Sequence, residues 1–361
     1  MTEGEQQPGR IIEMRKNDHV DICANEDLSP GYYYWDDVKL VHRSLPEIDL
    51  ADVDTSVTLF GKKLSAPLVI SAMTGGYDKA REINGILASV AEEHGLGMGV
   101  GSQRAALENP ELADTYSVVG DYDIPLRIAN LGLPQLVRQR SESVLLPEDG
   151  RAAMDMIGAD VLAIHLNYLQ EVVQPEGDTC ARGGVEAIRT FASEMPVIAK
   201  ETGAGISRQM ALVLKKTGVR GFDIGGLGGT SFSAVEYYRA RKVRNEAREN
   251  IGKAFWDWGI PSPVSVVTAS VGLPLIATGG LRTGLDVARA LCIGASCGGM
   301  AGRLLPSALE GKEALEREVR MIVDELRAAM FLVGSREVEE LVSAQALVTG
   351  RTREWLDHVM E

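Results

Sequence analysis

The stretch that decides the fold of this chain is Asp160-Val161-Leu162-Ala163-Ile164-His165-Leu166-Asn167-Tyr168-Leu169-Gln170-Glu171. The run Val161 to Ile164 is apolar at every position, as expected of a strand that is buried on both faces. An imidazole, two amides and a carboxylate follow directly, at His165, Asn167, Gln170 and Glu171. Further apolar runs along the chain also end on polar or glycine residues. Strands that present polar groups at their carboxyl ends predict a parallel sheet with one chemical face.

Four amphipathic segments each end at a glycine and are followed within a few residues by an apolar run. These glycines are Gly95, Gly158, Gly218 and Gly294. Glycine readily takes the left-handed conformation just past the end of a helix, so each of them predicts a helix followed by a strand. Strands that alternate with helices predict βαβ units in a parallel sheet.

Eight runs are expected to form strands, which favours an α/β fold of the closed (β/α)8 TIM barrel type; a doubly wound open sheet is the alternative. We expect one domain over 1–361, with an N-terminal arm (1–64), a barrel core (65–304) and extra C-terminal helices (305–361). A long insertion after strand six should open with one charged helix, 234–250. The eight runs that are expected to form the barrel strands are Pro67 to Ser71, Gly97 to Gly101, Leu126 to Ala129, Val161 to His165, Val197 to Lys200, Gly221 to Ile224, Leu275 to Thr278 and Cys297 to Met300.

Composition and charge restrict the classes of partner. The net charge is -14 and the pI about 5.0, so nucleic acid is not an expected partner. The sequence shows no signal peptide at Met1 to Glu5 and no apolar stretch long enough to span a membrane. The four cysteines form no CxxC pair and are expected to be free thiols. We therefore expect a cytoplasmic protein that makes no contact with membranes.

Two glycine-rich strand ends favour a phosphate site. Gly279-Gly280-Leu281-Arg282 and Ala301-Gly302-Arg303 follow strands seven and eight, where barrels often bind phosphate. Lys200 ends strand five and could act as a Schiff-base amine, as a cation facing a cofactor, or in an ion pair with Glu201 or another carboxylate. Glu171 is a candidate Mg²⁺ ligand, or simply an exposed carboxylate at a helix start.

Eight strings occur in one order along the chain, from about residue 10 to the C-terminus: Arg15-Lys16-x-Asp18-His19, Ser71-Ala72-Met73-Thr74-Gly75-Gly76, Gly101-Ser102-Gln103-Arg104, His165-Leu166-Asn167-x-x-Gln170-Glu171, Gln174-Pro175-Glu176-Gly177-Asp178, Lys200-Glu201, Trp258-Gly259-Ile260-Pro261 and Gly279-Gly280-x-Arg282. In this order they resemble the type 2 isopentenyl diphosphate isomerases, FMN-dependent enzymes of isoprenoid synthesis. Tyr168 departs from the family, which usually has proline there.

The resemblance implies three groups of site residues besides Glu171 as the Mg²⁺ ligand. Gln170, His165, Asn167 and Lys200 would serve catalysis. Substrate would contact Arg15, Lys16, Ser102, Gln103, Arg104 and Gln170. FMN would contact Ser71, Ala72, Met73, Thr74, Ser102, Asn130, Lys200, Thr230, Gly279, Gly280, Leu281, Arg282, Ala301 and Gly302.

The implied reaction moves the double bond of isopentenyl diphosphate to give dimethylallyl diphosphate, without net redox change. Reduced FMN would be the acid/base, Mg²⁺ would neutralise the diphosphate, and NADPH would keep the flavin reduced. By family analogy the enzyme would be a homo-oligomer, a tetramer or an octamer. The main alternative is an FMN-dependent 2-hydroxy-acid oxidase, but no histidine occurs between His165 and His358 to serve as its base. Two further classes stay open, a Schiff-base aldolase that uses Lys200 and a non-catalytic regulator.

Overall fold

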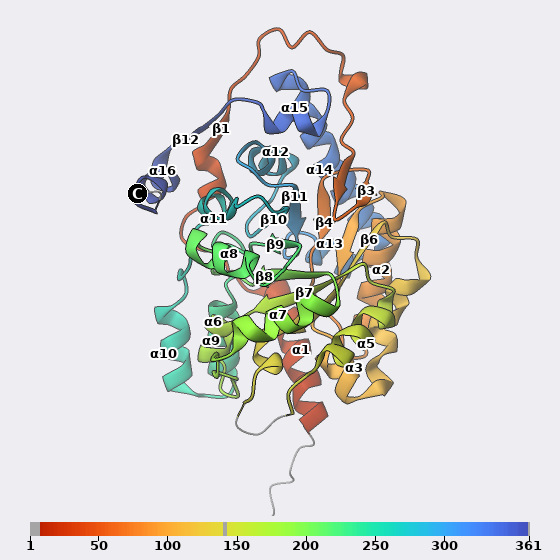
Figure 1. The fold of residues 1–361 in the computed structure, drawn as a ribbon, viewed down its shortest axis with the longest axis vertical. Coiled ribbons are helices and arrows are strands. Elements are labelled where there is room, and N and C mark those ends of the chain that lie inside the picture. The colour runs from red at the N-terminus through yellow and green to blue at the C-terminus, as the bar shows by residue number, and fades with distance from the viewer. Residues whose placement is uncertain (1–7, 140–142, 360–361) are drawn as a thin grey trace, which may run out of the picture.

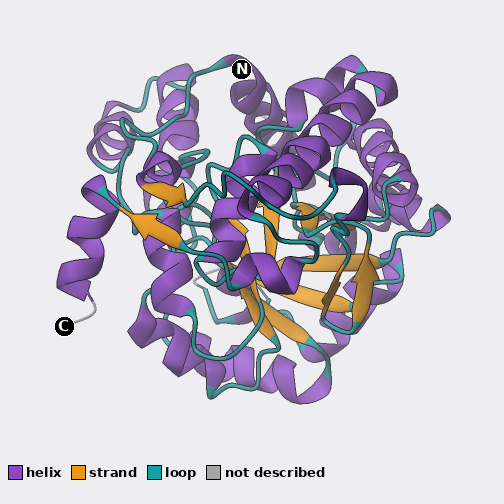
Figure 2. Cartoon of the chain, turned by 90° about the horizontal axis from the view of Figure 1, so that it is seen from above, coloured by secondary structure: helices purple, strands orange, loops and turns teal. Residues whose placement is uncertain are grey.

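Eight parallel strands close into a barrel in the computed structural model, which describes residues 8–139 and 143–359. Met1 to Glu5 thus lie outside the described residues. Seen from above, the strands lie in the middle of the molecule and helices surround them (Figure 2). The strands, in barrel order, are β10 (Leu275–Thr278), β11 (Cys297–Met300), β4 (Leu68–Ile70), β5 (Gly97–Gly99), β6 (Leu126–Gly132), β7 (Val161–Leu166), β8 (Val197–Glu201) and β9 (Gly221–Asp223).

These eight strands coincide with the eight predicted runs, so the predicted barrel is confirmed. Alternate residues of β7 face the barrel interior and the surrounding helices, and both sets are buried from Val161 to Ile164. Val161 and Ala163 of β7 lie in the interior cluster, whereas Leu162 and Ile164 pack in the cluster shared with the helices. Burial on both faces explains why most of the strands read as apolar runs, which Arg127 in β6 and Asp223 in β9 interrupt.

Helices follow the strands as predicted, and all four glycines named above have a positive φ, for example +62° at Gly158. The surrounding helices are α2 (Ala80–Glu93), α3 (Arg104–Glu108), α4 (Asp114–Ser117), α5 (Pro147–Ile157), α6 (Tyr168–Val173), α7 (Gly184–Glu194), α8 (Arg208–Lys215), α11 (Ser262–Ala269), α12 (Gly284–Cys292), α13 (Leu305–Glu310), α14 (Lys312–Val333) and α15 (Val338–Val342), with the short 3-10 helices η2 (Leu50–Asp52), η3 (Pro110–Leu112), η4 (Val118–Asp121) and η5 (Leu133–Leu136).

The insertion after β9 corrects one expectation. Instead of one helix over 234–250, it holds α9 (Phe232–Lys242) and α10 (Glu246–Ala254). Arg244 has a φ of +56°, which no helix accommodates, and Asn245 caps the new helix by accepting from the Arg248 amide. The whole segment has the charged composition of a helix. The break comes from Arg244 and Asn245, which the periodicity of the sequence does not reveal.

The N-terminal arm runs over both ends of the barrel. Its first helix, α1 (Pro8–Asn25), lies between α9 and α3 at the carboxyl ends of the strands (Figure 1). The hairpin β2 (Val57–Leu59) and β3 (Lys62–Leu64) closes the opposite end with Leu59 and Leu64. Between them, η1 (Tyr34–Asp37) leads into β1 (Val38–Leu40).

The C-terminal segment packs against this arm. β12 (Ala346–Val348) pairs antiparallel with β1, and α16 (Gly350–Val359) follows beside it, on the left of Figure 1. Asp37 ties the two segments together, because its carboxylate accepts from the Thr352 amide at 2.9 Å and hydroxyl at 2.8 Å. Among the described residues, no helix is both long and apolar enough to cross a membrane.

Candidate active site

A cavity of about 500 Å³ opens at the carboxyl ends of the barrel strands, and α1 covers it. Nearly all site residues expected from the sequence line this cavity. They are Arg15, Lys16, Ser71, Ala72, Met73, Thr74, Ser102, Arg104, Asn130, His165, Asn167, Gln170, Glu171, Lys200, Thr230, Gly279, Gly280, Leu281, Arg282, Ala301 and Gly302.

Gln103 is the exception, which corrects the expectation that it contacts substrate. Its side chain is fully buried in the barrel wall, where the amide donates to the Ala153 carbonyl at 2.7 Å and accepts from the Asn130 N–H at 3.0 Å. Its neighbours Ser102 and Arg104 do line the cavity. Gln103 therefore holds β6 against α5 and supports Asn130 from behind.

One side of the cavity is formed by backbone that follows β9, β10 and β11. We call it the glycine side; it consists of Gly225-Gly226, Gly228-Gly229, Gly279-Gly280 and Ala301-Gly302. The loops approach so closely that a Cβ on Gly280 would lie 2.2 Å from the Gly228 carbonyl oxygen, and one on Gly229 would lie 2.7 Å from the Gly280 nitrogen. Gly280 also has a φ of +79°. Only glycine satisfies both conditions, so this wall presents bare backbone to a ligand.

Three hydroxyl groups beside the glycine side are buried without a hydrogen-bond partner. They are Ser71 Oγ and Thr74 Oγ1 after β4 and Thr278 Oγ1 at the end of β10. All three residues line the cavity. Buried polar groups are normally paired, so these hydroxyls indicate a polar ligand in this part of the cavity.

His165 is held as a neutral imidazole. Asn130 Nδ2 donates to the Val100 carbonyl, which leaves Asn130 Oδ1 facing His165 Nδ1 at 2.8 Å. A carbonyl oxygen can only accept, so Nδ1 carries the proton and Nε2 keeps a lone pair. Burial, followed by the charge of Lys200, lowers the pKa of His165 to about 3. The residue can therefore accept or relay a hydrogen bond at neutral pH but is not a cation.

Lys200 lines the cavity as half of a buried ion pair. Its Nζ lies 2.6 Å from Oδ2 of Asp223 on the neighbouring strand β9, and both side chains are nearly inaccessible to solvent. Adjacent Glu201 is not its partner, because Glu201 Oε2 accepts the N–H groups of residues 202–205. Schiff-base lysines are activated by apolar or cationic surroundings, so the pairing of Lys200 with a carboxylate opposes the Schiff-base alternative.

Glu171 is buried among hydrogen-bond donors at the start of α6. Its Oε1 accepts from Asn167 Nδ2 at 2.8 Å, and Oε2 accepts from Gln174 Nε2 and the Asp178 amide. Burial raises the pKa of Glu171 to about 6. Asn167 Oδ1 is buried without a partner. The described residues contain no cluster of three or more His, Cys, Asp and Glu that could hold a metal alone, so a cation here would need ligands from substrate or water.

Three cations of the arm and of α3 meet at the cavity. Lys16 donates to the Ser102 carbonyl at 2.8 Å and to the Tyr116 hydroxyl, and Arg15 and Arg104 lie beside it. Burial, then the charges of Arg15 and Arg104, lowers the pKa of Lys16 to about 7. Cations crowded together in this way favour an anionic ligand, since an anion between them would relieve their repulsion.

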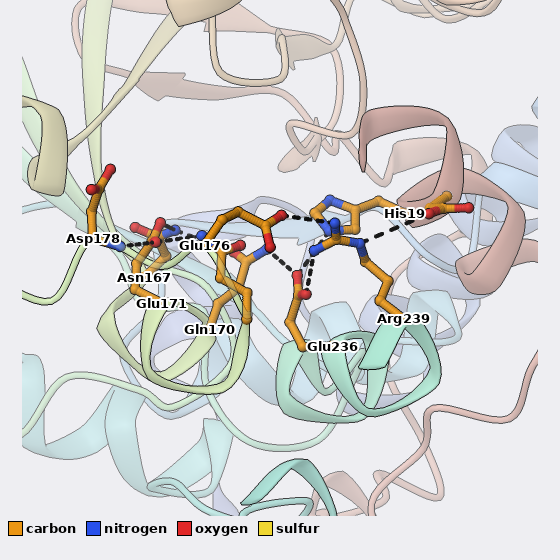
Figure 3. A network of polar contacts seen from close by, with 10 residues as sticks. His19, Asn167, Gln170, Glu171, Glu176, Asp178, Glu236 and Arg239 are labelled. Carbon is orange, nitrogen blue, oxygen red and sulfur yellow. Dashed lines mark hydrogen bonds and ion pairs between the residues drawn. The ribbon is translucent and has the colours of Figure 1, made fainter. Parts of the chain in front are cut away.

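The charged side of the cavity is the part lined by Arg15, Lys16, His19, Arg104, Gln170 and Glu171. A polar network that includes His19 and Gln170 fixes α1 to the insertion (Figure 3). Fully buried Glu236 of α9 accepts from His19 Nε2 at 2.8 Å and from Gln170 Nε2 at 3.0 Å, and pairs with Arg239 at 2.6 Å. Burial alone would raise the pKa of Glu236, but His19, Arg239 and Gln170 together lower it to about 2.

Sequence reasoning missed Glu236, Arg239 and Asp223. Glu236 and Arg239 lie in an insertion whose sequence is typical of an ordinary charged helix. The one available signal was that this insertion directly follows the sixth barrel strand, β9. Tyr168 did not disturb the local fold. It is the first residue of α6, a position where proline is also favourable, and its hydroxyl donates to the Cys180 carbonyl at 3.2 Å.

Comparison with known proteins gives one family model and many relatives. The model for FMN-dependent dehydrogenases matches residues 260–348. Solved structures share the fold at low identity: a mandelate oxidase variant with (S)-mandelic acid (TM-score 0.60, 16% identity, 95% of this chain and 98% of that one) and a lactate oxidase of Pediococcus acidilactici (TM-score 0.63, 13% identity, 97% and 96%).

Much closer relatives are named isopentenyl-diphosphate delta-isomerase. That of Picrophilus torridus is 47% identical over 347 residues, which cover 96% of this chain and 99% of the relative. Those of Thermoplasma volcanium (96% and 100% covered) and Archaeoglobus fulgidus (95% and 98% covered) are each 48% identical. Identity at this level over nearly the whole of both chains shows that this chain belongs to the isopentenyl-diphosphate delta-isomerase family.

Proposed function

We propose that this chain converts isopentenyl diphosphate into dimethylallyl diphosphate, with reduced FMN and Mg²⁺. The observation that carries the proposal is the division of one cavity into a backbone-lined glycine side and a charged side. The first suits a tightly held cofactor and the second an anionic substrate that enters and leaves. Family membership supports the same reaction.

The residues of the glycine side fit FMN. The hydroxyls of Ser71, Thr74 and Thr278 lack partners, and the loops at Gly279 to Arg282 and Ala301-Gly302 offer backbone and a guanidinium to a phosphate. Met73, Ser102, Asn130, Lys200 and Thr230 complete the expected contacts. The reduced flavin, when bound, would supply the acid/base group that no ordinary side chain provides for an unactivated alkene.

Glu171 fits Mg²⁺ as one carboxylate ligand, with Asn167 Oδ1 as an unpartnered oxygen beside it. Mg²⁺ is commonly held by one or two carboxylates together with substrate phosphates and water, and it would neutralise the diphosphate here. This arrangement agrees with the lack of a larger acidic cluster among the described residues.

The chain's own groups would bind and orient the substrate. Arg15, Lys16 and Arg104 would bind the diphosphate through charge-assisted hydrogen bonds. The α1 helix would exclude water from the reacting carbons. Gln170 is oriented at both ends of its amide, by Glu236 and by Asn167, so it would present a fixed face to the substrate. Neutral His165, whose Nε2 keeps a lone pair, would accept a hydrogen bond.

Further parts of the proposal come from composition or from the family resemblance. They are a cytoplasmic location, NADPH as the reductant, a homo-oligomer of four or eight copies, and a single domain over 1–361. The oxidase alternative receives only fold-level support from the mandelate and lactate oxidases, and the chain has no histidine between His165 and His358 to act as its base.

An anaerobic assay tests the proposal. Purified protein with FMN, Mg²⁺ and isopentenyl diphosphate, reduced with dithionite under nitrogen, should form dimethylallyl diphosphate without consuming reductant in proportion to product. The oxidised, air-saturated protein should be inactive. Equal turnover by the oxidised protein would exclude reduced flavin as the acid/base, and oxygen uptake with a 2-hydroxy acid would favour the oxidase instead.

A further inference from the structure

The aromatic run Tyr32-Tyr33-Tyr34-Trp35 has no role in the proposed reaction, yet two of its side chains contact the loop after β10. The Trp35 indole is fully buried and donates to the Gly279 carbonyl at 2.9 Å. The Tyr33 ring lies under the guanidinium of Arg282, whose Cζ is 3.7 Å from the ring centroid. The arm thus contacts both ends of the Gly279 to Arg282 loop, which lines the cavity.

The Tyr33 hydroxyl completes the support through Asp286. This carboxylate is 1% exposed, and its Oδ2 accepts from the Tyr33 hydroxyl and from the backbone amides of Arg282 and Thr283. Its Oδ1 pairs with Arg289 at 2.8 Å, which offsets the negative charge near the loop. Tyr33 therefore contacts Arg282 through its ring and, through Asp286, the backbone of the same residue.

Stacking has a specific consequence for a guanidinium. The ring covers one flat face of the Arg282 guanidinium. Its five N–H donors lie in the plane of the guanidinium and are not covered by the ring. An arginine held in this way is oriented for bidentate binding of a phosphate before the phosphate arrives. Without the ring, the exposed and flexible side chain would lose rotamer freedom on each binding event.

We propose that Tyr33 is a positioning residue for the phosphate group of the cofactor: it orients Arg282 toward that phosphate, with Trp35 fixing the other end of the loop. The inference rests on the proposed function in taking FMN as the cofactor. It concerns the phosphate and not the isoalloxazine ring, so it predicts a loss in affinity for FMN that riboflavin does not share.

The test measures dissociation constants of the apoprotein for FMN and for riboflavin by flavin fluorescence. Tyr33→Leu, which removes the ring and the hydroxyl, should weaken FMN about five- to tenfold, in keeping with a cation–π contact and an oriented charged hydrogen bond. Riboflavin affinity should change less than about twofold, as for substitutions away from a ligand's contacts. Tyr33→Phe keeps the ring, is nearly isosteric and should lie between wild type and Tyr33→Leu.

The chain offers a matched control at the preceding residue. Tyr32 also carries a guanidinium over its ring (Arg351, 4.5 Å) and donates its hydroxyl to an aspartate (Asp37, 2.7 Å), but these partners belong to the C-terminal segment and η1. Tyr32→Leu should leave the affinities for both flavins unchanged, although it removes the same kinds of contact.

Three outcomes overturn the inference: Tyr33→Leu and Tyr33→Phe that bind FMN as tightly as wild type, equal losses for FMN and riboflavin, or an equal FMN loss in Tyr32→Leu. Each of these leaves the proposed isomerase activity standing. A wild-type protein that binds neither flavin overturns the proposed function itself.

Discussion

The two sides of the cavity are built by opposite means. On the glycine side, loops after β9, β10 and β11 touch through backbone atoms, and the shape would not survive a single added Cβ at Gly280. On the charged side, the shape depends on side chains of α1 and α6, where buried Glu236 of α9 holds His19 and Gln170 in place. A wall of backbone atoms has no group that titrates, whereas a charged network responds to pH. The comparison suggests that the permanent cofactor occupies the first and the exchanging substrate the second.

The largest effect is expected from a methyl group on the glycine side. In Gly280→Ala the new Cβ would lie 2.2 Å from the Gly228 carbonyl oxygen, so overpacking adds to the cost of a φ of +79°. We expect a loss of about 3 kcal/mol or more in the free energy of unfolding, together with loss of FMN binding. Urea unfolding and flavin titration measure the two quantities.

Gly61→Ala is the matched control, since Gly61 has nearly the same φ, +80°, but nothing within 4 Å of the added Cβ. It should cost only about 1 kcal/mol and leave FMN binding intact. If the two variants were equally destabilised, the close approach of the loops would have no special importance, and the contrast between the two sides would fail.

The fold was predictable because the barrel strands are buried on both faces and the helices end at glycines, two signals that are local in sequence. The pairing of β1 with β12 was not, because it joins short segments that are far apart along the chain and whose composition is unremarkable. The break between α9 and α10 was missed for a different reason. It depends on the backbone of Arg244, and a charged helix shows no change in periodicity there.

The place of the candidate site was predictable, because parallel strands bring their carboxyl ends together and the motif residues follow those ends. Direction was harder to predict. Ser102, Gln103 and Arg104 are consecutive, yet the side chain of Gln103 points into the wall, where it bonds the Ala153 carbonyl and the Asn130 amide. Partners that arrive from other elements, such as Asp223 for Lys200 and Glu236 for Gln170, depend on tertiary packing that no motif encodes.

On the charged side, the largest expected effect comes from Arg15. Arg15→Ala should cost roughly 2–4 kcal/mol of diphosphate binding, because it removes one charge-assisted partner, and so raise KM strongly while FMN content stays unchanged. Steady-state kinetics on the reduced enzyme measures this. The control is Lys242→Ala, which removes an exposed ion pair between α9 and Asp18 of α1. It should change the free energy of diphosphate binding by less than about 0.5 kcal/mol. A protein beginning at residue 20 that kept wild-type kcat/KM would show that the arm does not contribute to the site.

Glu171 should have the next largest effect. Glu171→Gln should weaken the response of activity to Mg²⁺ by about tenfold or more, since a carboxylate ligand is replaced by a neutral amide, while FMN affinity is kept. Glu176→Gln is the control, because Glu176 lies in the neighbouring Gln174 to Asp178 string but pairs with Arg239 and does not line the cavity. An unchanged Mg²⁺ titration of Glu171→Gln would show that Glu171 is not a Mg²⁺ ligand.

The smallest predicted effect is a pH dependence that only the charged side should show. Burial and neighbouring cations lower the pKa of Lys16 to about 7, so its positive charge is present below pH 7 and is lost as the pH rises. KM for the diphosphate should therefore rise above pH 7, by at most about tenfold per pH unit because one proton is involved. Glu171 acts in the opposite direction: its pKa is about 6, so the proposed Mg²⁺ site should weaken below pH 6. Diphosphate binding should therefore be tightest between about pH 6 and pH 7.

The glycine side provides the contrast. The FMN dissociation constant should stay level between about pH 7 and 9, because the backbone wall has no group that titrates there. Lys16→Arg keeps a permanent charge and should flatten the alkaline limb, which a profile of KM against pH would reveal. If the wild-type profile were flat, or if Lys16→Arg kept the same alkaline rise, another group would be responsible and the charged side would owe its pH response to something other than Lys16.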